Sequence, residues 1–286
     1  MEAIIINELS LNGQFLDKQD FWTNGVPPFC RVIKNAKSLG IMYYKQTQFY
    51  NSKATPNETL SSLLYSKDPL FKDAATKYKS ILSNAINDEP YWDLAPQQDK
   101  RARYFLEGND VSGSSIAEAV ARTGCLLSFI RSSYVNDSII VQKDGVDIRV
   151  RNIWDEKQLY AILFDLGELT SKEYIISRFS GKKLDFSLID DNNGFSLIGQ
   201  ENQGEFIKSF QKFIELDWCD IETDNGLDYK RYNKNRKNKH YFPDNLWQKG
   251  IRKFRITQRY RCFGYVDNGI FYVLRFDLDH ELSDVG

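Results

Sequence analysis

Hydrophobic positions in the first half of the chain change repeatedly between strand-like and helix-like spacing. The run AIIINEL (3–9) predicts a short strand, and residues 28–40 place their apolar side chains on one helical face before a glycine. Residues 41–49 alternate as a strand does, and residues 68–88 again carry a helical stripe. This alternation predicts a mixed α/β domain.

The clearest local signal in this half is the segment SGSSIAEAVARTGCLLSFI at 112–130. Ser115 and Glu118 have the spacing of a capping box, and the apolar run CLLSFI follows the predicted helix as a buried strand. Residues 138–153 then predict a hairpin whose turn is Asp-Gly, and residues 156–169 predict another helix.

The second half contains a polar break followed by a different pattern. The stretch DDNNG (190–194) marks the predicted boundary between a mixed α/β domain at 1–190 and a second domain at 195–286. The second domain has an amphipathic helix at 203–216, an aperiodic basic loop at 219–249, and then the strands IRKFRIT, QRYRCFGYVD and IFYVLRFDL. The expected fold class is α+β, with a C-terminal helix and an antiparallel sheet of three or more strands.

The last two predicted strands are joined by Asn268-Gly269, the strongest short-range hairpin signal, because both central residues of a type I′ turn need positive φ. Counting back from this turn gives the expected cross-strand pairs: Val266 with Phe271, Tyr265 with Tyr272, Gly264 with Val273, Phe263 with Leu274, Cys262 with Arg275, and Arg261 with Phe276. Both faces are apolar near the turn and polar at the open end, where charged residues gather: Arg259, Arg261, Arg275, Asp277, Asp279 and His280. The preceding strand adds Lys253 and Arg255 on one face.

Charge changes this picture in one region. The net charge is −1, yet the segment from Tyr229 to Arg261 contains twelve Lys or Arg and one acid, Asp244. Such a block is typical of a phosphate-binding surface, and the alternative is a solvated, flexible loop. The candidate RNA-binding residues are Lys230, Arg231, Lys234, Arg236, Lys237, Lys239, His240, Arg252 and Arg259.

The remaining composition describes a packed protein, 42% hydrophobic and 14% aromatic. No apolar run approaches the roughly 20 residues that span a bilayer, and the N-terminus lacks the basic region of a signal peptide. A cytoplasmic location without membrane contact is therefore expected. The cysteines form no C-x-x-C pair and are expected to be buried thiols: Cys30, Cys125, Cys219 and Cys262.

Signals for cofactors and metals are weak. The run SGKK at 180–183 lacks the spacing of a phosphate loop, and DHE at 279–281 is too short for a metal motif, so neither a cofactor nor a metal is expected. Glu8, Asp110 and Glu118 could be imagined as the metal carboxylates of a PIN-like nuclease, but a capping role explains Glu118 better.

The run GIRKFRITQRYRCFGYVDNGIFYVLRFDLDHEL (250–282), preceded by helix 203–216, resembles the C-terminal half of RelE/ParE-superfamily toxins. In that family a helix precedes an antiparallel sheet with a basic strand, a strand containing Tyr-Arg, an apolar strand and often a terminal His or basic residue. RelE-like members cleave messenger RNA on the ribosome without a metal, whereas ParE-like members target gyrase. The resemblance implies a metal-independent ribonuclease or translation-targeting toxin-like protein of a bacterial toxin–antitoxin or phage-defence system.

Position by position, the resemblance implies that Arg255 and Arg261 stabilise a phosphate with help from Lys253, and that His280 is the general acid or base. Tyr260 is a secondary candidate. The chain departs from the family in its length and in the acids Asp277 and Asp279 beside His280.

Three functions therefore stay open. The first is RNA cleavage by the basic C-terminal cleft, with RNA or the ribosome as partner. The second is a sensor or adaptor that binds nucleic acid without chemistry. The third is docking of an acidic protein, such as an antitoxin, on the basic loop.

Overall fold

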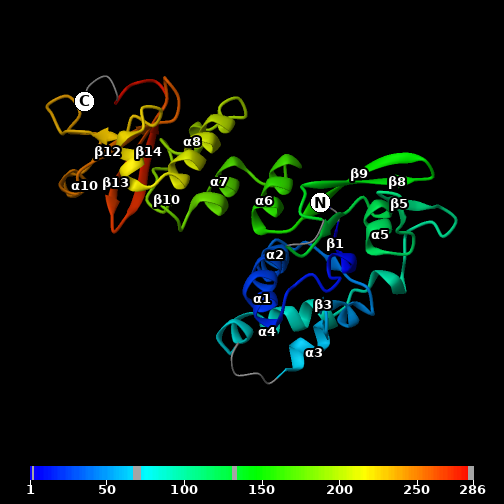
Figure 1. Ribbon diagram of the computed structural model, residues 1–286. Coiled ribbons are helices and arrows are strands. Elements are labelled where there is room, and N and C mark those ends of the chain that lie inside the picture. Colours follow the sequence, from blue (N-terminus) through cyan, green and yellow to red (C-terminus); the bar gives the residue numbers. More distant parts are fainter. Residues whose placement is uncertain (2, 67–71, 131–133, 283–286) are drawn as a thin grey trace. The chain divides into compact units, whose positions relative to one another are not determined.

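The computed structural model describes residues 1, 3–66, 72–130 and 134–282, and its chain divides into two compact units, 1–168 and 169–286 (Figure 1). The fold is α+β, as predicted. The division falls earlier than the predicted boundary at 190–194, because Ile175, Phe179 and Leu184 all belong to the hydrophobic core of the second unit.

The first unit is built on a seven-stranded mixed sheet. Its strands are β1 (Ile4–Ile6), β2 (Tyr43–Tyr44), β5 (Tyr104–Leu106), β6 (Asn109–Asp110), β7 (Cys125–Leu127), β8 (Ser138–Lys143) and β9 (Val146–Ile153). Their order is β2-β1-β7-β9-β8-β5-β6, parallel from β2 to β9 and antiparallel beyond it. A separate antiparallel pair consists of β3 (Lys53–Thr55) and β4 (Glu58–Thr59).

The helices of the first unit are α1 (Lys18–Asp20), α2 (Val26–Ser38), α3 (Leu60–Tyr65), α4 (Lys72–Asn87), α5 (Ser115–Ala121) and α6 (Glu156–Asp165). Helix α5 packs Ile116, Ala117 and Ala119 against one face of the sheet, including Ile5 and Leu126. The predicted helices at 28–40 and 156–169 are therefore present as α2 and α6. The first residues of the helix predicted at 68–88 lie outside the described residues, and α4 corresponds to the rest.

The predicted capping box at the start of α5 is wrong. The N-cap is Ser114, whose hydroxyl oxygen accepts a hydrogen bond from the Ile116 N–H at 3.2 Å. Ser115 is the first helical residue, and its N–H donates to Oε1 of Glu8 at 3.0 Å. Glu118 instead accepts from the Gln97 N–H at 2.9 Å and from Nε of Arg122. Its partners come from another segment and from the next helical turn, and its spacing from Ser115 does not reveal them.

The second unit is built on a five-stranded sheet, antiparallel except for its pairing with β10. Its strands are β10 (Leu184–Asp185), β11 (Lys230–Arg231), β12 (Arg252–Arg255), β13 (Arg261–Asp267) and β14 (Ile270–Asp277), in the order β10-β14-β13-β12-β11. The predicted antiparallel C-terminal sheet is thus present. The helices of this unit are α7 (Ser171–Phe179), α8 (Gln203–Glu215), α9 (Trp218–Thr223) and α10 (Asp244–Gln248).

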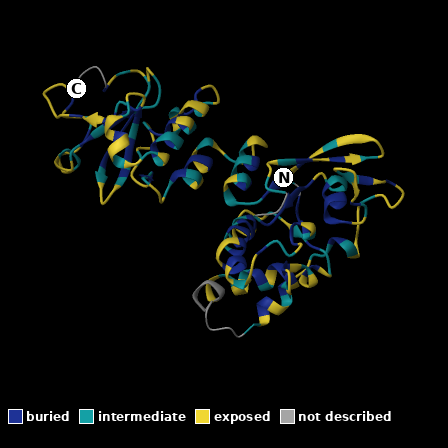
Figure 2. Ribbon diagram, viewed as in Figure 1, coloured by how far each residue is buried: buried dark blue, intermediate teal, exposed yellow. Residues whose placement is uncertain are grey.

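The two faces of this sheet carry different hydrophobic clusters. Helix α8 buries Phe206, Phe210 and Phe213 on one face, and Figure 2 shows buried and exposed residues alternating along this helix. The opposite face, here called the outer face, is covered by a smaller cluster. Its buried members are Tyr232, Phe242, Ile251, Phe263, Tyr265, Leu274 and Leu282.

The predicted register of the last hairpin is correct near the turn and wrong beyond Gly264. Val266, Tyr265 and Gly264 oppose the predicted partners, but Phe263 pairs with Arg275 because Leu274 forms a bulge. Consequently Cys262 opposes Phe276, and Arg261 opposes Asp277. The loop that precedes α8 binds the bulged region, since the Asp190 N–H donates to the Leu274 carbonyl at 2.8 Å and the Phe276 N–H to the Asn193 carbonyl at 2.7 Å.

Candidate nucleic-acid interface

Four cations from three strands lie on the outer face of the second sheet. Lys230 pairs with Lys253 across β11 and β12, and Arg255 pairs with Arg261 across β12 and β13. Residues directly opposite each other share a face, as do residues two apart on a strand. The side chains of Lys230, Lys253, Arg255 and Arg261 therefore share one face, and the prediction that Lys253 and Arg255 lie together is confirmed. Arg231 and Arg252, one residue away, lie on the other face.

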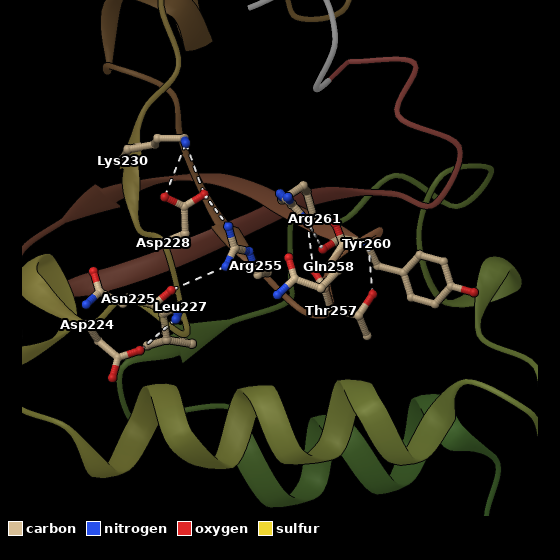
Figure 3. Close-up of polar contacts among 10 residues, drawn as sticks. All are labelled: Asp224, Asn225, Leu227, Asp228, Lys230, Arg255, Thr257, Gln258, Tyr260 and Arg261. Atoms are coloured by element: carbon tan, nitrogen blue, oxygen red, sulfur yellow. Dashed lines mark hydrogen bonds and ion pairs between the residues drawn. The ribbon is translucent and has the colours of Figure 1, made fainter.

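Asp228 lies between two of these cations, Lys230 and Arg255 (Figure 3). Its Oδ2 lies 3.0 Å from Nζ of Lys230 and 3.1 Å from Nη2 of Arg255. Burial alone would raise the pKa of this carboxyl, but the hydrogen bond from Lys230 and the charges of Lys230, Arg255 and Arg261 outweigh it, so the pKa lies below its ordinary value. Asp228 is thus held as an anion at neutral pH.

The side chain of Arg261 binds the backbone of the turn between β12 and β13. Its Nη1 donates to the carbonyl oxygens of Thr257 at 2.7 Å, Tyr260 at 3.0 Å and Gln258 at 3.1 Å (Figure 3). This guanidinium group therefore closes the turn that places Tyr260, the secondary candidate, with its ring 6.2 Å from that of Phe206.

Lys253 is buried, with 6% of its surface exposed, and its ammonium group lies among aromatic rings. Nζ is 5.1 Å from the ring centroid of Tyr232 and 5.8 Å from that of Phe263, which is cation–π distance. Desolvation, with the nearby positive charges of Lys230 and Arg261, lowers the pKa of Lys253 below its usual value. The described chain therefore surrounds this lysine more closely than the other three cations.

His280 lies in the turn that follows β14, where its backbone has φ +62° and its side chain is half-buried. Since β14 ends opposite Arg261, His280 lies at the same end of the sheet as the clustered cations. The adjacent Asp279 forms an exposed ion pair with Arg259, 3.2 Å apart, which joins this turn to the β12–β13 turn.

A second group of cations lies on the segment 233–240, NKNRKNKH, which is part of the predicted loop at 219–249. From here on, the name basic loop refers to residues 233–240 alone. Its asparagines organise the backbone. Asn238 is fully buried, its Nδ2 donates to the Asn233 carbonyl at 2.8 Å, and its Oδ1 accepts from the Asn235 N–H at 2.7 Å. The Oδ1 of Asn235 accepts in return from the N–H groups of Lys237 and Asn238, at 2.8 and 3.0 Å. Residues predicted as either functional or flexible thus form a hydrogen-bonded loop.

The cations of the basic loop point away from this scaffold. Lys234, Arg236, Lys237 and Lys239 are all exposed. Lys234 forms an exposed ion pair with Asp244, whereas Arg236, Lys237 and Lys239 have no carboxylate within 4.0 Å among residues 1, 3–66, 72–130 and 134–282. The described residues therefore leave three neighbouring positive charges available to an outside anion.

An aromatic pair borders these charges. The exposed ring of His240 and the half-buried ring of Tyr241 have centroids 4.2 Å apart, inclined at 38°. Aromatic faces beside a basic surface are a common arrangement for stacking unpaired bases.

The remaining predicted residue, Arg252, is half-buried over the Tyr229 ring and lies 3.9 Å from Glu222.

Asn238 is expected to be needed for the order of the basic loop. Replacing Asn238 with alanine removes a buried side chain that satisfies the chain at Asn233 and Asn235, so the second unit should lose about 1–3 kcal/mol of stability. Hydrogen exchange by mass spectrometry should show faster exchange at 233–241. The exposed Asn245 is the matched control, since Asn245→Ala should leave exchange in the loop unchanged. Equal protection in both variants would contradict this role.

The first unit contains a polar network that sequence reasoning missed. Asn7, Ser128 and Asn152 are all buried and follow or end the parallel strands β1, β7 and β9. Nδ2 of Asn7 donates to the Ser128 hydroxyl at 2.9 Å, and that hydroxyl donates to Oδ1 of Asn152 at 2.7 Å. The network joins the ends of three strands. Its members are far apart along the chain, so nothing in the sequence near any one of them indicates that they bind one another.

The imagined metal carboxylates do not form one group. Glu8 binds the start of α5, Glu118 binds Arg122, and Asp110 lies on the exposed strand β6 beside Arg103. Within the part of the chain that the structure describes, no three His, Cys, Asp or Glu side chains are arranged to hold a metal ion. Nor is any helix in that part long and apolar enough to cross a membrane.

Three of the four cysteines are buried as predicted, but Cys219 is exposed on α9. Burial raises the pKa of the Cys30 thiol to about 12 and that of Cys125 to about 11. The prediction is wrong for Cys219 because α9 buries Ile221 and turns Cys219 outward.

Comparisons with known proteins add no relative: no family model, no curated protein and no solved structure matches the chain.

Proposed function

We propose that the second unit binds single-stranded RNA through the basic loop. The observation that carries this proposal is that Arg236, Lys237 and Lys239 are exposed, form no ion pair within 4.0 Å among the described residues and are held by a buried asparagine scaffold. A fixed row of cations tracks a phosphate backbone, and the His240–Tyr241 pair offers a ring on which a base can stack.

Metal-independent RNA cleavage is the second candidate. It is supported by the position of His280 at the same sheet end as Lys253, Arg255 and Arg261. Against this, Lys253 is buried among rings and Arg261 is bound to three carbonyl groups, so neither is poised for a substrate. The observed contacts therefore favour binding over chemistry.

The test is equilibrium binding of a short labelled single-stranded RNA by the whole chain over a range of salt concentrations. Three phosphate contacts predict that log affinity falls against log salt with a slope of about −2, because each contact releases about 0.7 counterion from a single strand. The same RNA is recovered in EDTA and its length is measured. Intact RNA supports binding alone, and shortened RNA supports the cleavage candidate. An affinity that does not change with salt concentration, or the absence of binding, would contradict the proposal.

A further inference from the structure

The outer face of the second sheet contains a separate anion position, and Asp228 fills it. Oδ2 of Asp228 is shared between Nζ of Lys230 and Nη2 of Arg255, at 3.0 and 3.1 Å. Its other oxygen, Oδ1, lies 3.2 Å from Nζ of the same lysine. The charges of Lys253 and Arg261 also lie close enough to act on, or be influenced by, this carboxylate. Asp228 thus binds two of the four clustered cations of β11, β12 and β13. A second acid, Asp277 on β14, lies opposite Arg261 and acts on Lys253 and Arg261.

A short turn places this carboxylate between Lys230 and Arg255 (Figure 3). The Asp228 N–H donates to the Asp224 carbonyl at 3.0 Å, and the Leu227 N–H donates to Oδ1 of Asp224 at 2.6 Å. Nζ of Lys212 on α8 binds the same Asp224 oxygen at 2.7 Å. Asp228 itself has φ +45°, a left-handed conformation that Asp and Asn tolerate better than other non-glycine residues.

Asp228 leaves part of Arg255 without a partner. Nη2 binds Asp228, and Nη1 donates to the Asn225 carbonyl at 3.3 Å, but Nε is buried and makes no hydrogen bond with any residue that the structure describes. Nε and Nη2 form one edge of the guanidinium group, which matches two oxygens of a phosphoryl group. A phosphoryl group could use Nε, Nη2 and Nζ of Lys230 together, whereas Asp228 satisfies only two of the three.

We propose that Lys230 and Arg255 form a phosphoryl-binding site and that Asp228 is its built-in competitor. The inference rests on the proposed function in one respect, since RNA is the expected source of the phosphoryl group. The site is distinct from the basic loop. A ligand binds by displacing the Asp228 carboxylate, so the apparent affinity equals the intrinsic affinity multiplied by the small fraction of molecules in which Asp228 is already displaced.

Asp228→Asn tests this competition, because asparagine keeps the shape and the left-handed tolerance of Asp228 but removes its charge. The probe is inorganic phosphate, and its binding is measured by titration calorimetry. Phosphate should bind Asp228→Asn about tenfold or more tightly than wild type. Asp110→Asn is the matched control, since it makes the same charge change in the exposed pair with Arg103 of the first unit and should alter phosphate affinity less than about twofold.

The source of the phosphoryl group is distinguished with one RNA sequence carrying either a 5′-phosphate or a 5′-hydroxyl. A larger gain for the 5′-phosphate RNA on Asp228→Asn identifies a terminal phosphate, and equal gains identify internal phosphodiesters. Adding Arg255→Lys to Asp228→Asn should remove the gain, because lysine keeps the charge but lacks the paired N–H edge. Thermal unfolding verifies that each variant is folded.

The proposal is overturned if Asp228→Asn and Asp110→Asn strengthen phosphate binding equally, or if folded Asp228→Asn gains nothing. Its failure is separable from that of the proposed function. If Asp228→Asn gains phosphate binding but the wild type does not bind RNA, the phosphoryl-binding site is supported and the proposed function is contradicted. If changes in the basic loop abolish RNA binding but Asp228→Asn does not affect phosphate binding, the proposed function is supported and the phosphoryl-binding site is contradicted.

Discussion

Replacing Arg236, Lys237 and Lys239 together with glutamine is expected to weaken single-stranded RNA binding by about 100-fold at about 0.1 M salt. Each phosphate contact to a single strand releases about 0.7 counterion, so each lost contact costs about fivefold at this salt concentration. The salt slope should become shallower by about 2 at the same time. Fluorescence anisotropy with labelled RNA measures both quantities.

The matched control removes equal charge elsewhere. Lys34, Lys37 and Lys208 are exposed helical lysines, and changing all three to glutamine lowers the net charge by the same amount. If binding depends on the basic loop, this control should stay within a few-fold of wild type. Equal losses in the two triple variants would mean that overall charge, and not the loop, attracts RNA. Unchanged far-UV circular dichroism would verify that both variants fold.

Phe213→Ala is expected to destabilise the second unit by about 3–5 kcal/mol. Phe213 is fully buried on α8, with its ring 4.6 Å from that of Phe254 and 5.5 Å from that of Phe271, so alanine leaves a cavity between the helix and the sheet. Hydrogen exchange in denaturant, resolved by peptide, should show the loss within 169–286. The two units have separate cores, so peptides of 1–168 should keep their stability.

The control for this variant is Phe213→Leu, which keeps most of the buried volume and should cost much less than the alanine change. Ile207 is a half-buried neighbour on the same helix, and Ile207→Ala should also cost less because the residue already contacts solvent. A uniform loss across 1–286 would contradict the independence of the two units. A loss below about 1 kcal/mol would contradict the central place of Phe213 in this core.

Binding by the loop and competition at the sheet face would make different contributions to recognition. Arg236, Lys237 and Lys239 of the loop form no ion pair within 4.0 Å among the described residues, so the loop would supply general affinity for a phosphate backbone. The Lys230–Arg255 site is already neutralised in part by Asp228, so it would respond to a ligand that binds better than a carboxylate does. The two sets of variants separate these contributions because they share no residue.

Much of the fold could be predicted from local pattern. Apolar spacing identified α2, α6 and α8, and Asn268-Gly269 identified the last turn, because helical period and turn chemistry are properties of neighbouring residues. Register failed at Leu274, where the backbone of Asp190 and Asn193 binds the strand from another segment. The division of the chain was likewise decided by which core α7 joins, and a polar stretch does not reveal that.

The sequence by itself determined which charges this protein has and that Lys253, Arg255 and Arg261 lie at one end of a sheet, since strand alternation is local. Only the tertiary structure decided which of these charges meet a partner. Lys253 lies against Tyr232 and Arg255 binds Asp228, whereas Arg236, Lys237 and Lys239 of the basic loop are exposed and form no ion pair among the described residues. The physical reason is that pairing and burial depend on segments brought together by folding, and a run of like charges is the same in sequence whether or not acids or rings lie opposite it.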